Sequence, residues 1–259
     1  MKKVISFLLF CLLAITQTVR ADVLGEYQFE GMLDGRIPVE ISFAVNCDEI
    51  AVGEILYPEA KHPAPILIVG SMHEWGYTFS EYQDDGTITG YISLQISEKE
   101  NSEPEVTSGT WSNPKTDKQF SFTNMKCVSQ SVDVPKFLDY EDPQNIGREY
   151  SFRTWSPQYN SYMGGNITFR GAGKHKLHFK VCNAQRNIAE GESEPNRPAE
   201  LAPYTYDSFT YNNVNECGYG FSAYFFKRFV VLKTITDYNT LGCFGMGASF
   251  DGVYIKVKQ

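Results

Sequence analysis

The feature that most constrains this chain is a succession of short segments in which apolar and polar residues alternate, separated by tight turns. In the clearest one, residues 37–45, Val39, Ile41 and Phe43 alternate with polar or small side chains. Such alternation places the apolar side chains on one face of a β-strand and the polar ones on the other. The first half of the chain contains no segment with helical periodicity. The chain is therefore predicted to be all-β.

Eight strand-like segments precede residue 128. Asp34-Gly35 and Asp85-Gly86 are hairpin signals, because these residues tolerate the positive φ angles of two-residue turns. Consecutive hairpins form an antiparallel meander, and closing it into a barrel removes the unpaired edges of an open sheet. We therefore expect an eight-stranded up-and-down meander or barrel. The predicted strands are residues 27–33, 37–45, 52–57, 66–72, 77–82, 87–97, 105–111 and 120–125.

The strand pattern stops at an acidic stretch, residues 128–147, which contains Pro135 and Pro143 and has no periodicity. Such composition is typical of a linker between domains. The sequence thus predicts a signal peptide, an N-terminal β-barrel-like domain, a linker and a C-terminal antiparallel β-domain. Their predicted ranges are 1–21, 22–127, 128–147 and 148–259.

The apolar run from Phe221 to Ile235 is long enough for a buried helix. Its β-branched and aromatic residues favour a strand instead. A strand is also predicted for residues 174–181, where His175 and His178 would point to opposite faces and would not form a metal pair.

The first residues have the three parts of a secretion signal. Lys2 and Lys3 precede an apolar run that ends at Ile15, and Val19 and Ala21 occupy the −3 and −1 positions of a cleavage site. The apolar run is shorter than the ~20 residues of a membrane-spanning helix. We expect cleavage after Ala21 and a periplasmic or secreted protein without a membrane span; an uncleaved anchor is the alternative.

Charge and motifs exclude several classes of function. The formal charge of −8 at pH 7 becomes −11 when the three basic residues of the signal are removed. Nucleic acid is an unexpected partner, because counterion release requires clustered Lys and Arg. The sequence has no G-x-S-x-G elbow, no C-x-x-C and no zinc-like spacing of histidines. We predict no catalytic, cofactor-binding or metal-binding residues.

The cysteines suggest disulfides, since an exported chain matures under oxidising conditions. Cys47 follows the second predicted strand and Cys127 follows the eighth, so both would lie at one rim of the barrel, on either side of the first strand. We therefore expect them to pair. Cys217 and Cys243 bracket the apolar run beside glycine-rich turns and form the second expected pair. Cys182 is expected to remain a thiol.

Glycines, turns and aromatic residues form a recognisable pattern at Gly31–Gly35, Pro38, Gly53–Tyr57, Glu81-Tyr82, Asp85-Gly86, Gly109–Trp111, Cys243–Gly247 and Gly252–Lys256. These stretches resemble β-domains of uncharacterised exported proteins of Gram-negative bacteria. They are also distantly similar to the small β-barrels of periplasmic lysozyme inhibitors. The resemblance implies a fold and an exported location, and carries no inhibitory residue across.

Aromatic residues are suited either to stacking on sugars or to filling a core, and a core is the favoured interpretation. They are Trp75, Trp111, Trp155, Tyr204, Tyr206, Phe209 and Tyr211.

We predict a non-enzymatic binding or inhibitor-type protein that recognises a protein or a glycan. One alternative is a glycan hydrolase that uses two carboxylates. The other is a lipocalin-like carrier with a cavity lined by Phe43, Tyr57 and Phe79.

Overall fold

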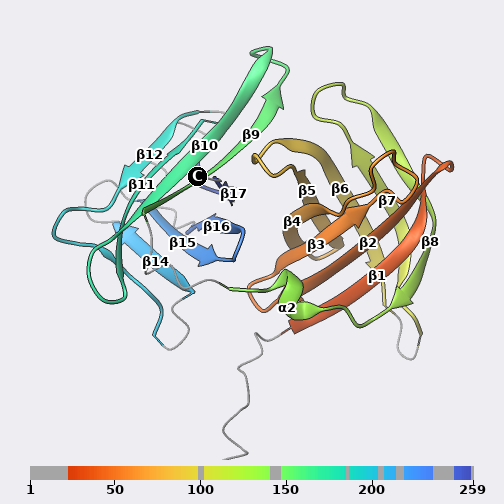
Figure 1. Cartoon of the computed structure of the whole chain (residues 1–259), viewed down its shortest axis with the longest axis horizontal. Coiled ribbons are helices and arrows are strands. Elements are labelled where there is room, and N and C mark those ends of the chain that lie inside the picture. Colours follow the sequence, from red (N-terminus) through yellow and green to blue (C-terminus); the bar gives the residue numbers. More distant parts are fainter. Residues whose placement is uncertain are drawn as a thin grey trace, which may run out of the picture.

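A computed structural model describes residues 23–98, 102–140, 147–184, 187–203, 207–213, 219–235 and 248–257. These residues form two antiparallel β-domains, as predicted (Figure 1). The first is a closed eight-stranded barrel in which each strand pairs with the next and β8 returns to β1. Its strands are β1 (Val23–Leu33), β2 (Ile37–Asn46), β3 (Ile50–Leu56), β4 (Ile66–His73), β5 (Gly76–Tyr82), β6 (Ile88–Ser97), β7 (Glu105–Ser112) and β8 (Gln119–Ser129).

Turn chemistry explains the first hairpin. Asp34 has a φ of 55° and Gly35 a φ of 66°, the left-handed values that a tight hairpin turn requires. One set of alternating apolar side chains, which includes Phe29, Ile41 and Phe43, then points into the barrel and forms its core.

The second domain is a curled sheet in the order β12-β11-β10-β9-β17-β16-β15-β14. Short strand β13 pairs with β11, and an isolated bridge joins Leu201 to Phe209 of β14, which brings the two sheet edges together. Its strands are β9 (Gly147–Ser156), β10 (Ser161–Gly171), β11 (Lys176–Asn183), β12 (Ala189–Glu192), β13 (Ala199–Glu200), β14 (Ser208–Asn213), β15 (Tyr219–Phe225), β16 (Phe229–Thr234) and β17 (Gly252–Lys256).

The apolar run from Phe221 to Ile235 forms parts of two strands rather than one. The chain turns between β15 and β16, where the Phe226 N–H donates to the Phe229 carbonyl at 2.9 Å. Lys227 and Arg228 occupy this turn with exposed side chains. Two consecutive charges within an apolar run thus mark a hairpin.

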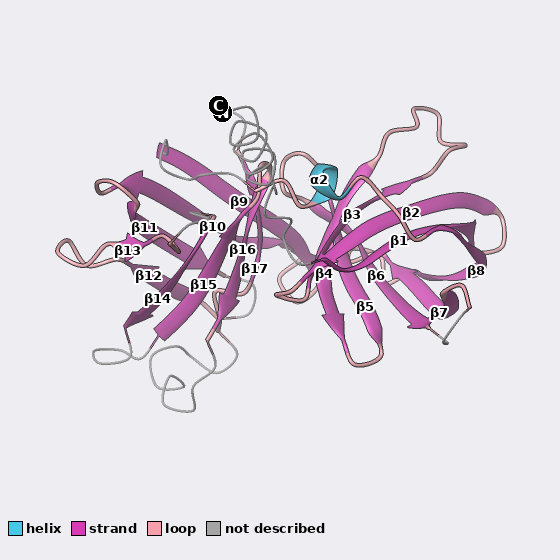
Figure 2. Ribbon diagram, turned by 90° about the horizontal axis from the view of Figure 1, so that it is seen from below, coloured by secondary structure: helices cyan, strands magenta, loops and turns pink. Residues whose placement is uncertain are grey.

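Three described residues of the predicted linker pack between the domains. The linker contains one helical turn, α2 (Val134–Phe137), which lies where the two domains meet (Figure 2). Val134, Phe137 and Leu138 are buried with outward-facing barrel residues and with the C-terminal sheet. Burying a large apolar side chain contributes roughly 1.5–3 kcal/mol. Residues 134–138 are therefore held by apolar packing, while residues 141–146 of the predicted linker lie outside the described residues.

A second contact joins the domains near the β2–β3 turn. The Tyr224 hydroxyl donates to Asp48 Oδ1 at 3.2 Å, and Lys233 donates to the Asp48 carbonyl. Burial, followed by the Asp48 charge, raises the pKa of Tyr224 to about 12. The tyrosine therefore remains a hydrogen-bond donor at any physiological pH.

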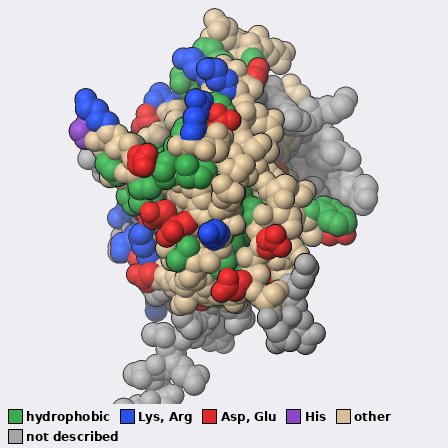
Figure 3. Space-filling model, turned by 90° about the vertical axis from the view of Figure 1, so that its right-hand side faces the viewer, with side chains coloured by type: hydrophobic (Ala, Val, Ile, Leu, Met, Phe, Trp, Pro, Cys, Tyr) green, Lys and Arg blue, Asp and Glu red, His purple; other side chains and the backbone are tan. Residues whose placement is uncertain are grey.

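The barrel side that faces away from the C-terminal sheet carries interspersed acidic and basic side chains (Figure 3). Within the described part of the chain, no helix has both the length and the apolar character to cross a membrane. The predicted signal peptide lies outside the described residues.

Candidate binding groove between the domains

The two domains enclose a groove of about 490 Å³. One wall is the outer surface of barrel strands β4–β7, and the other includes Phe152 of β9 and the start of β17. A groove between domains is a common position for a ligand site. Its chemistry follows from the side chains that the barrel strands direct outward.

A row of hydroxyl side chains crosses the barrel wall of the groove. Thr78 on β5 pairs with Ser93 on β6, which pairs with Thr110 on β7. The row continues to Ser71 on β4 and to Ser121 on β8. Neighbouring strands lie about 4.8 Å apart, so these hydroxyls repeat at about that spacing.

A second row runs beside the first, displaced by two residues on each strand. Ser80 pairs with Tyr91, Tyr91 with Ser112, and Ser112 with Gln119. Tyr91 is 39% exposed, so part of its ring is open to solvent among the hydroxyls. The two rows together form a surface of hydrogen-bonding groups around one aromatic ring.

The groove is nearly neutral in an acidic chain. Asp251 is the one charged side chain among the described residues that line it. Its carboxylate accepts the Thr234 N–H, and its carbonyl accepts Asn183 Nδ2 at 3.2 Å. These bonds hold Asp251 in the wall at the start of β17.

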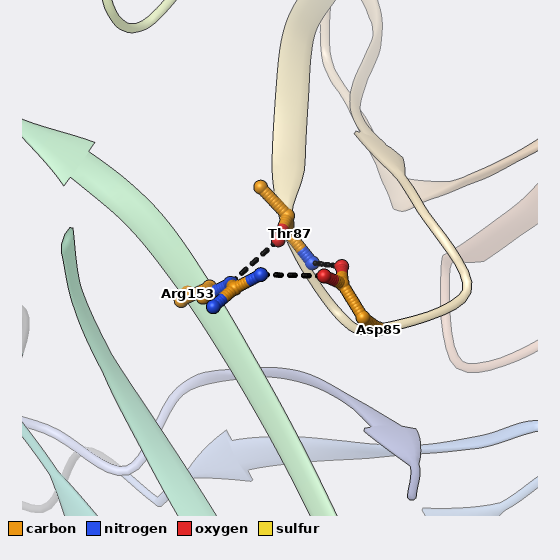
Figure 4. Close-up of polar contacts among 3 residues, drawn as sticks. All are labelled: Asp85, Thr87 and Arg153. Carbon is orange, nitrogen blue, oxygen red and sulfur yellow. Dashed lines mark hydrogen bonds and ion pairs between the residues drawn. The ribbon is translucent and has the colours of Figure 1, made fainter. Parts of the chain in front are cut away.

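Polar contacts fix the two walls relative to each other. Arg153 of β9 points at the β5–β6 turn, where Nε donates to Thr87 Oγ1 at 2.6 Å and Nη2 donates to Asp85 Oδ2 at 2.5 Å (Figure 4). The Tyr91 hydroxyl lies 2.8 Å from Oγ1 of Thr154, which follows Arg153 in the chain. The groove is therefore braced by side chains from both domains.

Gly86 allows the backbones to approach closely. Its φ is 80°, and a Cβ atom at this position would lie 2.4 Å from the Ser151 carbonyl oxygen. The Gly86 carbonyl instead accepts the Arg153 N–H at 3.0 Å. A side chain here would separate the β5–β6 turn from β9.

Aromatic rings extend along β9 and β10 beyond Arg153. Trp155 and Tyr162 meet edge to face, with centroids 5.3 Å apart. Lys115, from the β7–β8 turn, lies 4.7 Å from the centroid of the Trp155 ring. Tyr162 is 46% exposed, so this end of the interface offers an aromatic surface.

A buried carboxylate occupies the barrel interior. Glu81 is 4% exposed and accepts hydrogen bonds from Tyr57 at 3.0 Å, Thr89 at 2.5 Å and Trp111 Nε1 at 3.2 Å. Gly90 makes room for the indole, because a Cβ there would lie 2.3 Å from Trp111 Nε1. Burial, then the Glu81 charge, raises the pKa of Tyr57. Three donors satisfy the carboxylate, which indicates a structural role.

The centre of the barrel is filled by aromatic rings. Phe43 lies 5.0 Å from Phe79, 4.9 Å from Tyr77 and 4.9 Å from Tyr27, measured between centroids. In the carrier alternative, Phe43 and Phe79 would line a cavity, whereas in the structure they pack against each other. This contact disfavours the carrier interpretation.

The structure separates the first pair of predicted disulfide cysteines. Cys127 lies next to Phe29 on β1, whereas Cys47 follows Asn46, which lies opposite Val23. Phe29 and Val23 are about 20 Å apart in an extended strand, and a disulfide joins Cα atoms about 5.5 Å apart. Accordingly, no disulfide links Cys47 to Cys127 in the described residues. Strand β8 continues beyond Cys127, so this residue does not lie at the barrel rim.

Of the three remaining cysteines of the predicted mature chain, the structure describes Cys182. Cys182 forms no disulfide with another described cysteine, and its Sγ lies 3.7 Å from Glu190 Oε1. Burial and the Glu190 charge raise the pKa of this thiol. Cys217 and Cys243 lie outside the described residues, so their pairing stays a prediction.

One histidine contacts a serine hydroxyl. His178 Nδ1 lies 2.8 Å from Ser193 Oγ, a pairing of the kind that activates a nucleophile. However, Ser193 is 8% exposed and also accepts the Phe179 N–H at 3.3 Å. This hydroxyl joins β11 to the segment after β12, which favours a structural role. His175 lies in a turn with a φ of 58°, and the described residues contain no cluster suited to a metal.

The aromatic residues singled out in the sequence have different surroundings. Phe209 and Tyr211 are buried in the C-terminal core, as the favoured interpretation predicts. Trp111 stacks on Phe120 with centroids 5.8 Å apart. Trp75 is 70% exposed in the β4–β5 turn. Tyr204 and Tyr206 lie outside the described residues.

Sequence reasoning missed the hydroxyl rows. The outward residues of β5, β6 and β7 that line the groove carry no charge, and this was a usable signal in the sequence. Its meaning depends on strand register, which aligns Thr78, Ser93 and Thr110.

A comparison of the chain with models of protein families, with curated proteins and with solved structures found no match.

Proposed function

We propose that this chain is a non-enzymatic binding protein that recognises a neutral glycan in the groove between its domains. The observation that carries the proposal is the double row of hydroxyls around Tyr91 on the barrel wall. Serine and threonine hydroxyls both donate and accept hydrogen bonds, which matches the hydroxyls of a sugar. An exposed aromatic ring adds an apolar surface for a sugar ring.

The charge of the groove supports a neutral ligand. An acidic glycan would meet Asp251 in a chain whose formal charge is −8, and like charges oppose binding. A neutral glycan meets no such repulsion. The contacts of Arg153 and Tyr91 across the groove also reduce the ordering that binding requires, because the walls are already held together.

The test is binding of the purified mature chain to an array of immobilised oligosaccharides, followed by titration of the best neutral ligand. Thr78→Val with Thr110→Val removes two groove hydroxyls and keeps side-chain shape. We expect about tenfold weaker binding, since each lost hydrogen bond contributes about 0.5–1.5 kcal/mol.

The matched control is Thr107→Val with Thr123→Val, which changes exposed threonines of β7 and β8 that do not line the groove. This variant is expected to bind like the wild type. Absence of binding on the array, or equal losses in both double variants, would contradict the proposal.

The proposal includes export to the periplasm or the cell surface through the predicted signal peptide. N-terminal sequencing of the chain from the periplasmic fraction of a Gram-negative host is expected to begin at Asp22. Recovery of a cytoplasmic chain that retains Met1 would contradict export.

Recognition of a protein through Trp75 is a second candidate function. This ring is 70% exposed in the β4–β5 turn, and tryptophan is enriched among residues that dominate protein interfaces. A protein partner would bind the wild type and the Thr78→Val, Thr110→Val variant, but not Trp75→Ala. A partner that binds Trp75→Ala as well would exclude this candidate.

A further inference from the structure

Both rows of polar side chains continue past the edge of the groove onto β8. Ser121 pairs with Thr110 of the first row, and Gln119 pairs with Ser112 of the second row. Neither Ser121 nor Gln119 lines the groove, and both are exposed. Phe120 lies between them and packs against the barrel core, so the two side chains share the outer face of β8. We refer to Gln119 and Ser121 as the outer pair.

The side chains of the outer pair are available to a ligand. Among the residues that the structure describes, neither of them has a hydrogen-bonding partner for its side chain. The same is true of the hydroxyls of Thr78, Ser93 and Thr110 in the first row. Each of these groups can therefore exchange its hydrogen bonds with water for hydrogen bonds with a bound molecule.

The first row is too long for a single sugar ring. Thr78 and Thr110 are two strand spacings apart, which is about 10 Å, and Ser121 is one spacing farther, at about 14 Å from Thr78. The groove has a volume of about 490 Å³, which also exceeds that of one hexose. Successive units of an extended glycan lie about one strand spacing apart, so a chain can place one unit on each strand from β5 to β8.

The neutral surface ends just beyond the outer pair. The Asp34 N–H donates to the Ser121 carbonyl at 2.9 Å, and the Asp34 carboxylate forms an ion pair with Arg36 at 2.9 Å. The closed barrel also curves between β7 and β8, so a ligand that follows the row must bend. Rotation about glycosidic bonds allows a glycan chain to do so.

We propose that the ligand of the groove is a linear neutral oligosaccharide of about four units, whose outermost unit hydrogen-bonds to Gln119 and Ser121 on β8. This inference rests on the proposed binding of a neutral glycan and identifies that glycan as a chain rather than a single sugar. Gln119 supplies an amide donor and a carbonyl acceptor, and Ser121 supplies a hydroxyl. The outer pair therefore suits the hydroxyls of an uncharged sugar.

The experiment uses unbranched oligomers of glucose, galactose, mannose and N-acetylglucosamine, each from the monosaccharide to the hexasaccharide. The mature chain is screened against all of them on an array, and the series that binds is titrated by calorimetry. We expect the affinity to rise by about tenfold from the disaccharide to the tetrasaccharide, because the added units reach further hydrogen-bonding groups. Beyond the tetrasaccharide the affinity is expected to level off, since the chain then meets the Asp34–Arg36 ion pair.

Variants of the outer pair locate the added contacts. Gln119→Ala with Ser121→Ala is expected to weaken binding of the tetrasaccharide by about tenfold and to leave binding of the disaccharide unchanged. The matched control is Gln95→Ala with Ser108→Ala, which changes the same residue types on β6 and β7. These two side chains lie outside the groove lining and bond each other, with Ser108 Oγ donating to Gln95 Oε1 at 2.7 Å. The control is expected to bind every oligomer like the wild type.

Circular dichroism checks that each variant is folded, and Ser121→Ala alone replaces the double variant if that one does not fold. Equal affinity for the monosaccharide and the tetrasaccharide would overturn this inference and leave glycan binding in the groove intact. Equal losses for the disaccharide and the tetrasaccharide in the outer-pair variant would also overturn it. Absence of binding by every oligomer would overturn the inference together with the proposed function.

Discussion

Arg153 of β9 and Asp85 of the β5–β6 turn form an ion pair across the domain boundary, with Nη2 2.5 Å from Oδ2. The same guanidinium donates to Thr87, which is 9% exposed. A single side chain of the C-terminal sheet thus engages two residues of one barrel turn (Figure 4). The position of the groove wall depends on this contact.

Replacing Arg153 with Gln is expected to lower the free energy of unfolding by about 1–2 kcal/mol. Most of this loss comes from the hydrogen bond to Thr87, because exposed ion pairs contribute little. Urea denaturation measures the change. Arg36→Gln is the control, since it breaks an exposed ion pair with Asp34 in a hairpin turn, and about 0–0.5 kcal/mol is expected. Equal losses would mean that the Arg153 contact adds nothing specific.

Acid is expected to weaken the Asp85 contact. Hydrogen bonds from Thr87, and then the charge of Arg153, hold the pKa of Asp85 below its usual value of 3.8. A lowered folded-state pKa means that the ionised carboxylate stabilises the fold above the unfolded-state pKa. This contribution is lost as the pH falls through the folded-state pKa.

The wild type is therefore expected to be more stable than Asp85→Asn near neutral pH, and the difference is expected to disappear in strong acid. Urea denaturation of both proteins across this pH range measures the difference. A difference that grows as the pH falls would show that the sign is wrong.

Gly90→Ala is expected to destabilise the barrel by about 1–3 kcal/mol, the usual cost of overpacking. The new methyl group would lie 2.3 Å from Trp111 Nε1 and would displace the indole from Glu81. The same change in a Trp111→Phe background is expected to cost less, because the smaller ring leaves room. A double-mutant cycle of unfolding free energies measures this coupling. Additive effects of the two substitutions on the unfolding free energy would exclude a coupling between Gly90 and Trp111.

Peptide mapping under non-reducing conditions is expected to yield no peptide that links Cys47 to Cys127. The β1 residues beside which the two cysteines lie are about 20 Å apart along the strand. Cys182 is expected to react slowly with alkylating reagents near neutral pH, since burial and Glu190 raise its pKa. A Cys47–Cys127 link would contradict the register of β8 on β1.

Much of the barrel was predictable because its strands alternate strictly. Residues 37–45 and 77–82 were expected as strands and correspond to β2 and β5 within one residue at each end. A tight turn such as Asp34-Gly35 depends only on neighbouring residues, so the local sequence is sufficient to predict it.

Features that depend on distant residues were not predictable. The burial of Phe137 requires the C-terminal sheet, and the position of Cys127 depends on the stagger that closes the barrel. The hydroxyl rows are the same kind of feature. Thr78 and Thr110 are ordinary outward residues in the sequence, and only the pairing of both with Ser93 makes them one surface.

The most direct test of the central claim is chemical-shift mapping of the isotopically labelled mature chain with the best neutral oligosaccharide from the array. Glycan binding in the groove is expected to give saturable shifts centred on Thr78, Tyr91 and Thr110, with smaller changes near Asp251. Shifts confined to the exposed Trp75 turn, with the hydroxyl rows unaffected, would contradict glycan binding in the groove.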